Sequence, residues 1–273
     1  MSIVGLTPEE LRQFIQQHHE RTYSLIDVRQ PGEYEYGHIP GALLMPLPKL
    51  VQSMENLPRD RELIFYCQNG GRSLAAAAMV EDEAVVSGTL HNLTGGVMAW
   101  DGAMTPEYPR IRIFQASGTL DEKLETAMNL EKGALNFYSF VSDRHAAQPW
   151  AEVFAKLAQA EIAHARMVYN FRQRGKKTTG DSFEDCFAGL SGDILEGGMT
   201  LQGAVGKAVE AKGRICLKLI DLALQIEYAA FDLYRTMAGQ AADSDSHEAF
   251  IAIAQAEKAH MRELVKAIGS CPH

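Results

Sequence analysis

One cysteine stands where its thiol could act as a nucleophile. Cys67 follows the apolar run 63–66, which predicts a buried strand, and precedes the helical run 73–80. A thiol at a helix N-terminus lies under backbone N–H groups, and here also beside Arg72; both favour the thiolate. Glycines in the loop let the backbone curl into an anion nest. We expect Cys67 and Arg72 to be catalytic, and the surrounding loop to hold an anionic sulfur such as a persulfide; its other residues are Gln68, Asn69, Gly70, Gly71 and Ser73.

The segments around this loop alternate between short apolar runs and helical runs. Residues 24–28 and 63–66 are apolar enough to be buried strands. Thr7-Pro-Glu-Glu10 carries a capping box with Pro at the first helical position. Such alternation predicts a parallel sheet with helices on both faces.

Four separated motifs in this half resemble the rhodanese family. They are Asp27-Val-Arg29, Glu33-Tyr34, Gly37-His-Ile-Pro-Gly-Ala42 and Thr94-Gly-Gly-Val-Met-Ala-Trp100, in the family's order over about residues 5–106. The resemblance implies a sulfurtransferase in which Cys67 takes sulfur from a sulfane-sulfur donor and passes it to a thiol or to cyanide. Gln68 replaces an Arg that thiosulfate-using members often carry, so thiosulfate stays open as the donor. Arg72 comes one position earlier than in phosphatases of related architecture, and this smaller cradle suits sulfur better than phosphate.

Other residues of these motifs are expected to support the fold. We interpret Asp27 and His38 as hydrogen-bonding groups of turns and loops, and Trp100 as a core residue. Arg29 has two open roles, which are orienting the substrate loop and pairing with an acid.

The remaining cysteines are Cys186, Cys216 and Cys271, and the chain has no C-x-x-C pair. We therefore expect neither a disulfide framework nor a cysteine-rich metal site. These three thiols are expected to be unreactive, with resolution of a persulfide by Cys271 as the alternative.

A second constellation consists of acids on helical stripes that are otherwise apolar. In four predicted helices the core-facing stripe is broken only by Glu, or by Glu and His three residues later. An unpaired carboxylate in a core is very costly, but two divalent cations would neutralise four of them. The predicted ligands are Glu131, Glu161, His164, Glu227, Glu257 and His260.

An internal repeat supports this ligand set. Residues 158–164 recur 96 residues later as 254–260, and Glu131 and Glu227 lie at the same offset. Each Glu then lies about 18–22 Å along its helix from the turn of its hairpin, so that the four meet at mid-bundle. Tyr138 and Tyr234 also repeat at this offset. We interpret these tyrosines as packing residues, with hydrogen bonds to ligand groups as the alternative.

The pattern resembles the ferritin-like carboxylate-bridged di-iron family, and within it the rubrerythrin-type bundles, over about residues 115–270. This implies a four-helix bundle holding two metal ions. Oxygen-rich ligation with two imidazoles favours iron, with manganese or zinc as alternatives. Rubrerythrins usually carry a separate cysteine-ligated iron domain, which the absence of C-x-x-C pairs argues against here. Electrons for the metal site would then have to come from an external donor or from chemistry at Cys67.

Composition limits the partners. The net charge of −9 argues against nucleic-acid binding, and a long apolar run that could span a membrane is absent. The first residues lack the pattern of a signal peptide, so a cytoplasmic location is expected. We place the domains at residues 1–110 and 115–270, with a glycine-rich crossover at 175–206 inside the second. A homodimer is expected, because such bundles often pair.

The leading functional hypothesis is a sulfurtransferase fused to a di-iron redox domain. One alternative makes the bundle the main actor, a rubrerythrin-like reductase of peroxide or oxygen with the N-terminal domain as an accessory. The other is non-enzymatic, a sulfur carrier or an iron-binding protein.

Overall fold

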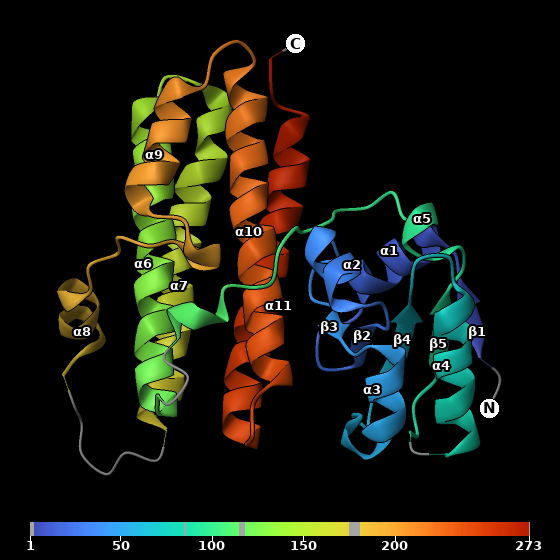
Figure 1. The fold of residues 1–273 in the computed structure, drawn as a ribbon. Coiled ribbons are helices and arrows are strands. Elements are labelled where there is room, and N and C mark those ends of the chain that lie inside the picture. Colours follow the sequence, from blue (N-terminus) through green and yellow to red (C-terminus); the bar gives the residue numbers. More distant parts are fainter. Residues whose placement is uncertain (1–2, 85, 115–117, 175–180, 273) are drawn as a thin grey trace. The chain divides into compact units, whose positions relative to one another are not determined.

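The computed structural model describes residues 3–84, 86–114, 118–174 and 181–272. The chain divides into two units, Met1–Tyr108 and Pro109–His273, each with its own core (Figure 1). The first is an α/β domain and the second is a helical bundle, which confirms the predicted fold classes.

The first unit is built on a parallel sheet in the strand order β1-β5-β4-β2-β3. The strands are β1 (Val4–Leu6), β2 (Tyr23–Asp27), β3 (Leu43–Leu44), β4 (Glu62–Tyr66) and β5 (Leu90–Leu93). Its helices are α1 (Pro8–Gln17), α2 (Pro31–Tyr36), α3 (Leu47–Gln52), α4 (Gly71–Asp82) and α5 (Gly96–Ala99), with a 3₁₀ turn η1 (Met54–Asn56). Thr7 and Glu10 form the predicted capping box of α1.

Two apolar layers cover the faces of this sheet. Alternate residues of β4 enter opposite layers, because successive side chains of a strand point to opposite faces. Leu63 and Phe65 pack in a cluster with side chains of α3 and α4. Ile64 and Tyr66 pack in the other, with side chains of α1 and α2. Strand β4 is therefore buried on both sides, and Cys67 at its carboxyl end is held by a rigid element.

The second unit is built from four long helices. These are α6 (Leu120–Arg144), α7 (Glu152–Gln173), α10 (Ile215–Gly239) and α11 (Ser244–Ile268) (Figure 1). Helix α6 packs along α7 and α10 along α11, and α7 also contacts α11. Short 3₁₀ turns η2 (Ile111–Ile113) and η3 (Pro149–Ala151) precede α6 and α7. The two hairpins are the two copies of the internal repeat.

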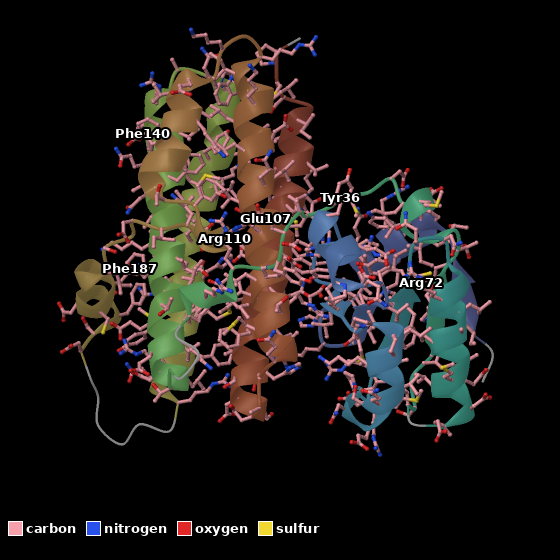
Figure 2. All side chains as sticks on the ribbon, in the orientation of Figure 1. Tyr36, Arg72, Glu107, Arg110, Phe140 and Phe187 are labelled. Atoms are coloured by element: carbon pink, nitrogen blue, oxygen red, sulfur yellow. A yellow bond between two sulfur atoms is a disulfide. The ribbon has the colours of Figure 1, made fainter. Side chains whose placement is uncertain are left out.

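A long crossover joins the hairpins. It contains α8 (Phe183–Gly189), the 3₁₀ turn η4 (Glu196–Gly198) and α9 (Leu201–Glu210). Of the predicted glycine-rich stretch, residues 175–180 lie outside the described residues. The Lys132 ammonium of α6 donates to three carbonyls at the end of α8, including that of Phe187. Phe187 lies on α8 (Figure 2). These bonds satisfy carbonyls that a helix C-terminus leaves free and fix α8 on α6.

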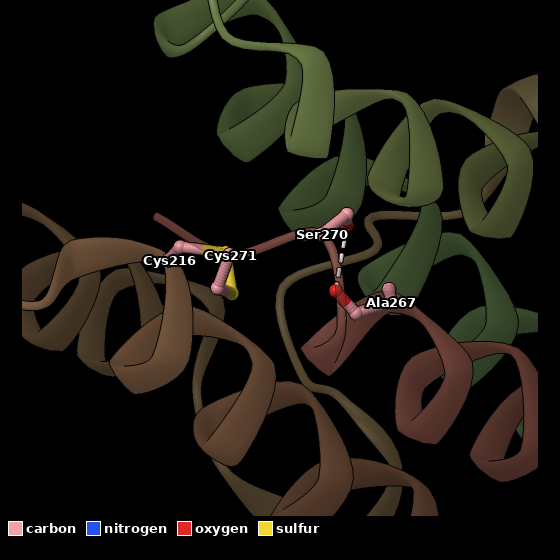
Figure 3. The surroundings of a disulfide bond; sticks show 4 residues. All are labelled: Cys216, Ala267, Ser270 and Cys271. Atoms are coloured by element: carbon pink, nitrogen blue, oxygen red, sulfur yellow. Dashed lines mark hydrogen bonds between the residues drawn. A yellow bond between two sulfur atoms is a disulfide. The ribbon is translucent and has the colours of Figure 1, made fainter. Parts of the chain in front are cut away.

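Two of the cysteines form a disulfide, which corrects the expectation that they are incidental thiols. Cys216 in the first turn of α10 is bonded to Cys271, which follows the end of α11, with their Cα atoms 5.6 Å apart (Figure 3). The bond ties the ends of one hairpin together, and it leaves Cys271 no free thiol with which to resolve a persulfide. No local sequence pattern indicates this pairing, since the partners are 55 positions apart in the chain. None of the helices in the described part of the chain combines the length and apolar composition needed to cross a bilayer.

Candidate functional site

The Cys67 thiol lies at the carboxyl end of β4, beside the first turn of α4. The residue has no exposed surface. The backbone N–H of Gly70 donates to its Sγ at 3.2 Å, and the Ser73 hydroxyl lies 3.4 Å from it. Gly70 has a φ of 92°, a left-handed conformation that suits glycine, and this turns the N–H toward the sulfur. The loop therefore forms the anion nest that the sequence predicts.

The Ser73 hydroxyl has more than one partner. Its Oγ lies 2.6 Å from Oδ1 of Asn92, whose amide in turn donates to the carbonyl of Gly70 at 3.3 Å. A hydroxyl has one hydrogen to donate. That hydrogen can point to Asn92 while Cys67 is a thiol, and turn to Sγ when it is a thiolate. Sequence reasoning missed Asn92; its signal was a polar residue within the buried strand β5.

Helix α5, which contains the second glycine of the Thr94–Trp100 motif, packs against the cysteine loop. Backbone N–H groups of α5 donate to the carbonyls of Cys67 and Gln68, at 2.8 and 3.0 Å. Gly96 has a φ of 58°, and a Cβ there would lie 2.3 Å from the Cys67 carbonyl oxygen. These bonds fix the backbone of the loop, in which the Gly70 N–H donates to the sulfur.

These contacts decide the ionisation of the thiol. Burial raises the pKa of Cys67, but donation from the Ser73 hydroxyl and from the backbone N–H groups of the loop outweighs burial. The net result is a pKa below the ordinary thiol value. More of the thiol is therefore in the nucleophilic form at neutral pH than in a free cysteine.

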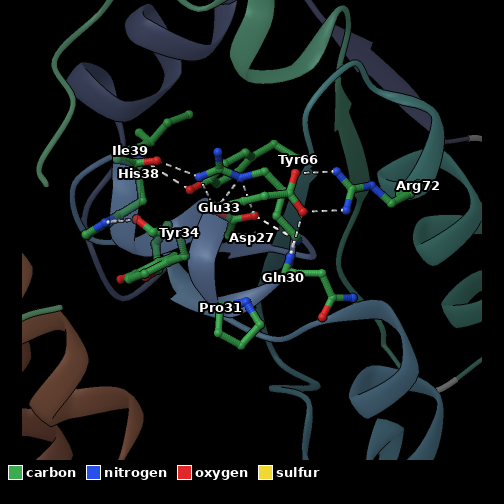
Figure 4. A network of polar contacts seen from close by, with 12 residues as sticks. Asp27, Gln30, Pro31, Glu33, Tyr34, His38, Ile39, Tyr66 and Arg72 are labelled. Atoms are coloured by element: carbon green, nitrogen blue, oxygen red, sulfur yellow. Dashed lines mark hydrogen bonds and ion pairs between the residues drawn. The ribbon is translucent and has the colours of Figure 1, made fainter. Parts of the chain in front are cut away.

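Arg72 is held by an acid of α2. Its two terminal nitrogens donate to the two carboxylate oxygens of Glu33 at 2.8 and 2.7 Å (Figure 4). Hydrogen bonding from Arg72 lowers the pKa of Glu33 to about 2, so this carboxylate is ionised at neutral pH. The same bonds raise the pKa of Arg72, and Cys67 adds a smaller effect of the same sign. The Arg72 guanidinium therefore interacts electrostatically with the Cys67 sulfur, but its direct ion pair is with Glu33.

The remaining motif residues hold the fold. Asp27 and Arg29 form a buried ion pair, and the Arg29 guanidinium also donates to the Gly37 carbonyl at 2.7 Å (Figure 4). Of the two roles left open for Arg29, the structure shows pairing with an acid. His38 stacks on Tyr34 and its Nδ1 lies 3.1 Å from the Tyr34 carbonyl oxygen. These contacts connect β2 to the loop after α2.

In the second unit the six predicted ligands converge at mid-bundle. The four carboxylates are at most 1% exposed, and the two imidazoles stack with their centroids 4.5 Å apart. Nδ1 of His164 lies 3.3–3.7 Å from oxygens of Glu131, Glu161 and Glu257. Nδ1 of His260 lies 3.1–3.5 Å from oxygens of Glu161, Glu227 and Glu257.

These contacts divide the side chains into two overlapping groups that could each hold a metal ion. Glu161 and Glu257 contact both imidazoles, whereas Glu131 contacts only His164 and Glu227 only His260. Ligand atoms of the corresponding groups lie within 4.8 Å of one another. Within the described residues, Oε2 of Glu131, Oε2 of Glu161 and Oε1 of Glu257 have no hydrogen-bond partner. Buried oxygens without donors fit a site built for cations.

The protonation of the metal-free site agrees with this reading. Burial lowers the pKa of His164, but the surrounding carboxylates outweigh burial and raise it to about 11. Burial raises the pKa of Glu131 to about 7. In the metal-free protein, protons therefore supply the positive charge that the carboxylates need. Metal ions must displace them, so metal affinity should rise with pH.

Tyr138 and Tyr234 pack in the core of the bundle, as expected, and their hydroxyls also bond to two of the predicted ligand carboxylates, which was the alternative. The Tyr138 hydroxyl donates to Glu227, and the Tyr234 hydroxyl donates to Glu131 at 3.2 Å. Each bond crosses from one copy of the repeat to the other. Such bonds orient the carboxylates that hold a metal.

A further carboxylate lies in the same place. Glu196 of η4 is 3% exposed, and a ligand atom of it lies within 4.8 Å of those of Glu131 and Glu161. Sequence reasoning missed it because the glycine-rich crossover has no periodicity that would reveal a core-facing position.

Comparison with known proteins identifies both domains. The model of the rhodanese-like domain matches residues 7–103. A sulfurtransferase from Allochromatium vinosum is 38% identical over 76 residues, which cover 28% of this chain and 69% of that protein. The chain belongs to the rhodanese-like family. The putative sulfurtransferase YtwF of Bacillus subtilis is 34% identical over 83 residues, covering 30% of this chain and 78% of that protein.

Further matches include a larger protein, a solved structure and a second family model. The probable adenylyltransferase/sulfurtransferase MoeZ of Mycobacterium tuberculosis is 42% identical over 105 residues, and the chain spans only 26% of its length. Among solved structures, a rhodanese-like domain protein from Staphylococcus aureus is 23% identical with a TM-score of 0.34, covering 38% of this chain and 99% of that one. A model described as rubrerythrin matches residues 122–185. One chain thus joins a rhodanese-like domain to a rubrerythrin domain.

Proposed function

We propose that the rhodanese-like domain is a sulfurtransferase with Cys67 as its nucleophile. The Cys67 thiolate attacks the outer sulfur of a sulfane-sulfur donor, the S–S bond of the donor breaks, and a Cys67 persulfide forms. With thiosulfate the leaving group is sulfite. An acceptor thiolate or cyanide then attacks the outer sulfur and releases the Cys67 thiolate. The electron pairs balance in each step, so no external oxidant or reductant is needed.

Residues around the sulfur have separate roles in this proposal. The Gly70 N–H and the Ser73 hydroxyl stabilise the thiolate before attack and again after release. Arg72, paired with Glu33, is partly exposed and offers positive charge to an anionic donor. Because Cys67 has no exposed surface, the exposed loop residues Gln68 and Asn69 have to move aside for the donor.

The observation that supports this function most is the set of donors around a buried thiol whose pKa is lowered. Incubation with thiosulfate followed by mass spectrometry tests it. Wild type and Cys186→Ala, which removes the other free thiol, should each gain one sulfur atom, and Cys67→Ala should gain none. A thiosulfate–cyanide assay should show the same order. Equal, background-level rates for wild type and Cys67→Ala would exclude thiosulfate as the donor.

We also propose that the bundle holds two metal ions through Glu131, Glu161, His164, Glu227, Glu257 and His260, with iron as the favoured metal. Bound iron would supply electrons for reduction of peroxide or oxygen. The chain's own contribution is to hold the carboxylates in a dry core and to orient two of them through Tyr138 and Tyr234. An external electron donor would re-reduce the site.

The buried ligand set therefore favours a second candidate function, a peroxide reductase. Peroxide consumption by the reduced, iron-loaded protein tests it. Loss of this activity in Glu257→Gln with retention in Cys67→Ala would assign it to the bundle. Consumption no faster than that of metal-free protein would contradict it.

The redox state of the disulfide can indicate the compartment in which the protein works. Cytoplasmic location remains the prediction from the sequence, whereas a disulfide such as Cys216–Cys271 is typical of oxidising compartments. Thiol labelling of the protein directly after cell lysis would show whether the bond exists in the cell.

A further inference from the structure

Among the carboxylates that the described residues bring together at mid-bundle, Glu196 alone comes from outside the four long helices. It begins η4 in the crossover and is 3% exposed. A ligand atom of it lies within 4.8 Å of ligand atoms of Glu131 and Glu161. Its Oε1 has no hydrogen-bond partner within the described residues. A buried carboxylate beside two others, with an oxygen that has no donor, is stable when it takes up a proton or binds a cation.

The crossover is built to bring this side chain into the bundle. A Cβ at Gly133 of α6 would lie 2.1 Å from the Ile194 carbonyl oxygen, so the chain can pass there only over a glycine. Gly197 and Gly198 have φ values of 77° and 80°, and a Cβ at Gly197 would lie 2.4 Å from that of Ala229 in α10. The segment therefore sits directly on α6 and α10. These close contacts fix the backbone of the segment, and they place the Glu196 carboxylate beside those of Glu131 and Glu161.

The backbone of the segment closes on itself around Glu196. The N–H of Leu195 donates to the Met199 carbonyl at 2.8 Å, and the N–H of Gly198 donates to the Leu195 carbonyl at 3.0 Å. Ile194 and Thr200 form an antiparallel bridge. Because its backbone hydrogen bonds are satisfied in this way, the segment can be buried. The polar atom of Glu196 that remains without a hydrogen-bond partner is Oε1 of its carboxylate.

Glu196 also breaks the symmetry of the centre. The six predicted ligands form two equivalent sets, because the hairpins are copies of one repeat. Glu196 groups with Glu131 and Glu161, at the His164 end. In the described part of the chain, the group around Glu227 contains only Glu257 and His260. One end of the centre thus has an additional carboxylate.

We infer that Glu196 is a fifth carboxylate ligand of the metal centre, and that it makes the position beside Glu131 and His164 bind its ion more tightly than the position beside Glu227 and His260. The inference rests on the proposed two-metal site. An anionic ligand at one end strengthens the attraction for a cation there, and more strongly in a buried site than in water. The two ions therefore bind in sequence, the first at the Glu196 end.

Titration of the metal-free full chain with manganese(II), followed through the electron paramagnetic resonance signal of the free ion, tests this. Wild type should bind two ions in two resolved steps. Glu196→Gln should weaken the first step by about 10- to 100-fold or more, since even loss of a group that only orients a ligand has an effect of this size. Its two steps should then merge while the total remains two. Glu210→Gln, an exposed acid in the same crossover, should titrate like wild type.

Two further variants assign the steps to positions. Glu131→Gln should weaken the first step, and Glu227→Gln should weaken mainly the second. Helical circular dichroism checks that each variant folds, and Glu196→Gln should fold because no partner of Oε1 is lost. As a measurement that needs no variant, anomalous scattering from a crystal of the manganese-loaded wild type should place a Glu196 oxygen at coordination distance from one ion.

The outcomes separate the inference from the proposal beneath it. If wild type binds two ions and Glu196→Gln retains the two-step curve, the role of Glu196 is overturned and the two-metal site stands. A manganese ion with Glu196 turned away in the crystal would overturn it as well. If wild type binds less than one ion per chain, both the two-metal site and the role of Glu196 are overturned.

Discussion

At the scale of single residues, neutral donors stabilise the Cys67 sulfur most directly. The guanidinium of Arg72 makes its bidentate ion pair with Glu33, while Gly70 and Ser73 contact Sγ. Proximity in the sequence predicts that Arg72 acts beside the thiol. Its partner lies 39 residues away in the chain, and no local pattern indicates such a pairing.

The role of Ser73 gives a prediction for pH dependence. Replacement by Ala removes a donor that lowers the pKa of Cys67, so the pKa should rise toward, or above, that of an ordinary thiol. Alkylation of Cys67 by iodoacetamide should then reach half of its maximal rate at a higher pH than in wild type. A shift of one pH unit would correspond to about 1.4 kcal/mol. At high pH, where the thiol is ionised in both proteins, the rates should converge.

Ser53→Ala provides the matched control, because the Ser53 hydroxyl donates to the Lys49 carbonyl at the end of α3. It should leave the alkylation profile unchanged. Identical profiles for Ser73→Ala and wild type would show that the hydroxyl does not stabilise the thiolate.

At the scale of elements, α5 supports the cysteine loop from below. Gly96 is the point of closest approach, with a positive φ and no room for a Cβ. Gly96→Ala should lower the free energy of unfolding of the rhodanese-like domain by about 2–4 kcal/mol, through backbone strain and overpacking together. It should also slow sulfur transfer, because the loop carbonyls can no longer bond to α5 as they do now.

Urea unfolding can report on this domain alone. The chain has two tryptophans, Trp100 in the first unit and Trp150 in the second. A Trp150→Phe background therefore leaves Trp100 as the fluorescence reporter. Gly32→Ala is the control, since a Cβ there meets nothing within 4 Å. If Gly96→Ala unfolds at the same urea concentration as this control, the close approach is not a constraint.

The elements also show which parts of the sites a sequence can reveal. The convergence of the six helical Glu and His side chains was predictable, because three-residue spacing and a repeat both mark one helix face. Asn92 and Glu196 were not, since each acts through neighbours that only the folded chain brings near. Asn92 reaches Ser73 across 19 residues, and Glu196 reaches Glu131 through a crossover without helical periodicity.

At the scale of the whole molecule, the disulfide closes a hairpin of 55 residues. Closing a loop of this length should stabilise the bundle by up to about 4 kcal/mol, through the lost freedom of the unfolded chain. Cys271→Ala, or reduction with dithiothreitol, should therefore lower the urea midpoint of the second unit. Trp150 reports that transition in a Trp100→Phe background.

Two controls distinguish the effect of losing the disulfide bond from the effect of replacing a cysteine side chain. Dithiothreitol should have no further effect on Cys271→Ala, and Cys186→Ala should unfold like wild type because Cys186 is free. An oxidised protein that unfolds at the same urea concentration before and after reduction would contradict the stabilising role.

We expect one chain to carry a persulfide-forming thiol and a separate two-metal centre. Native mass spectrometry of the intact chain, after anaerobic iron(II) loading and incubation with thiosulfate, detects both at once. The main species should contain two iron ions and one added sulfur atom. Cys67→Ser should keep the iron and lose the sulfur, and Glu257→Gln should lose iron and keep the sulfur. A wild-type chain with less than one iron ion would exclude the two-metal centre, and a sulfur atom retained in Cys67→Ser would exclude Cys67 as the persulfide-forming thiol.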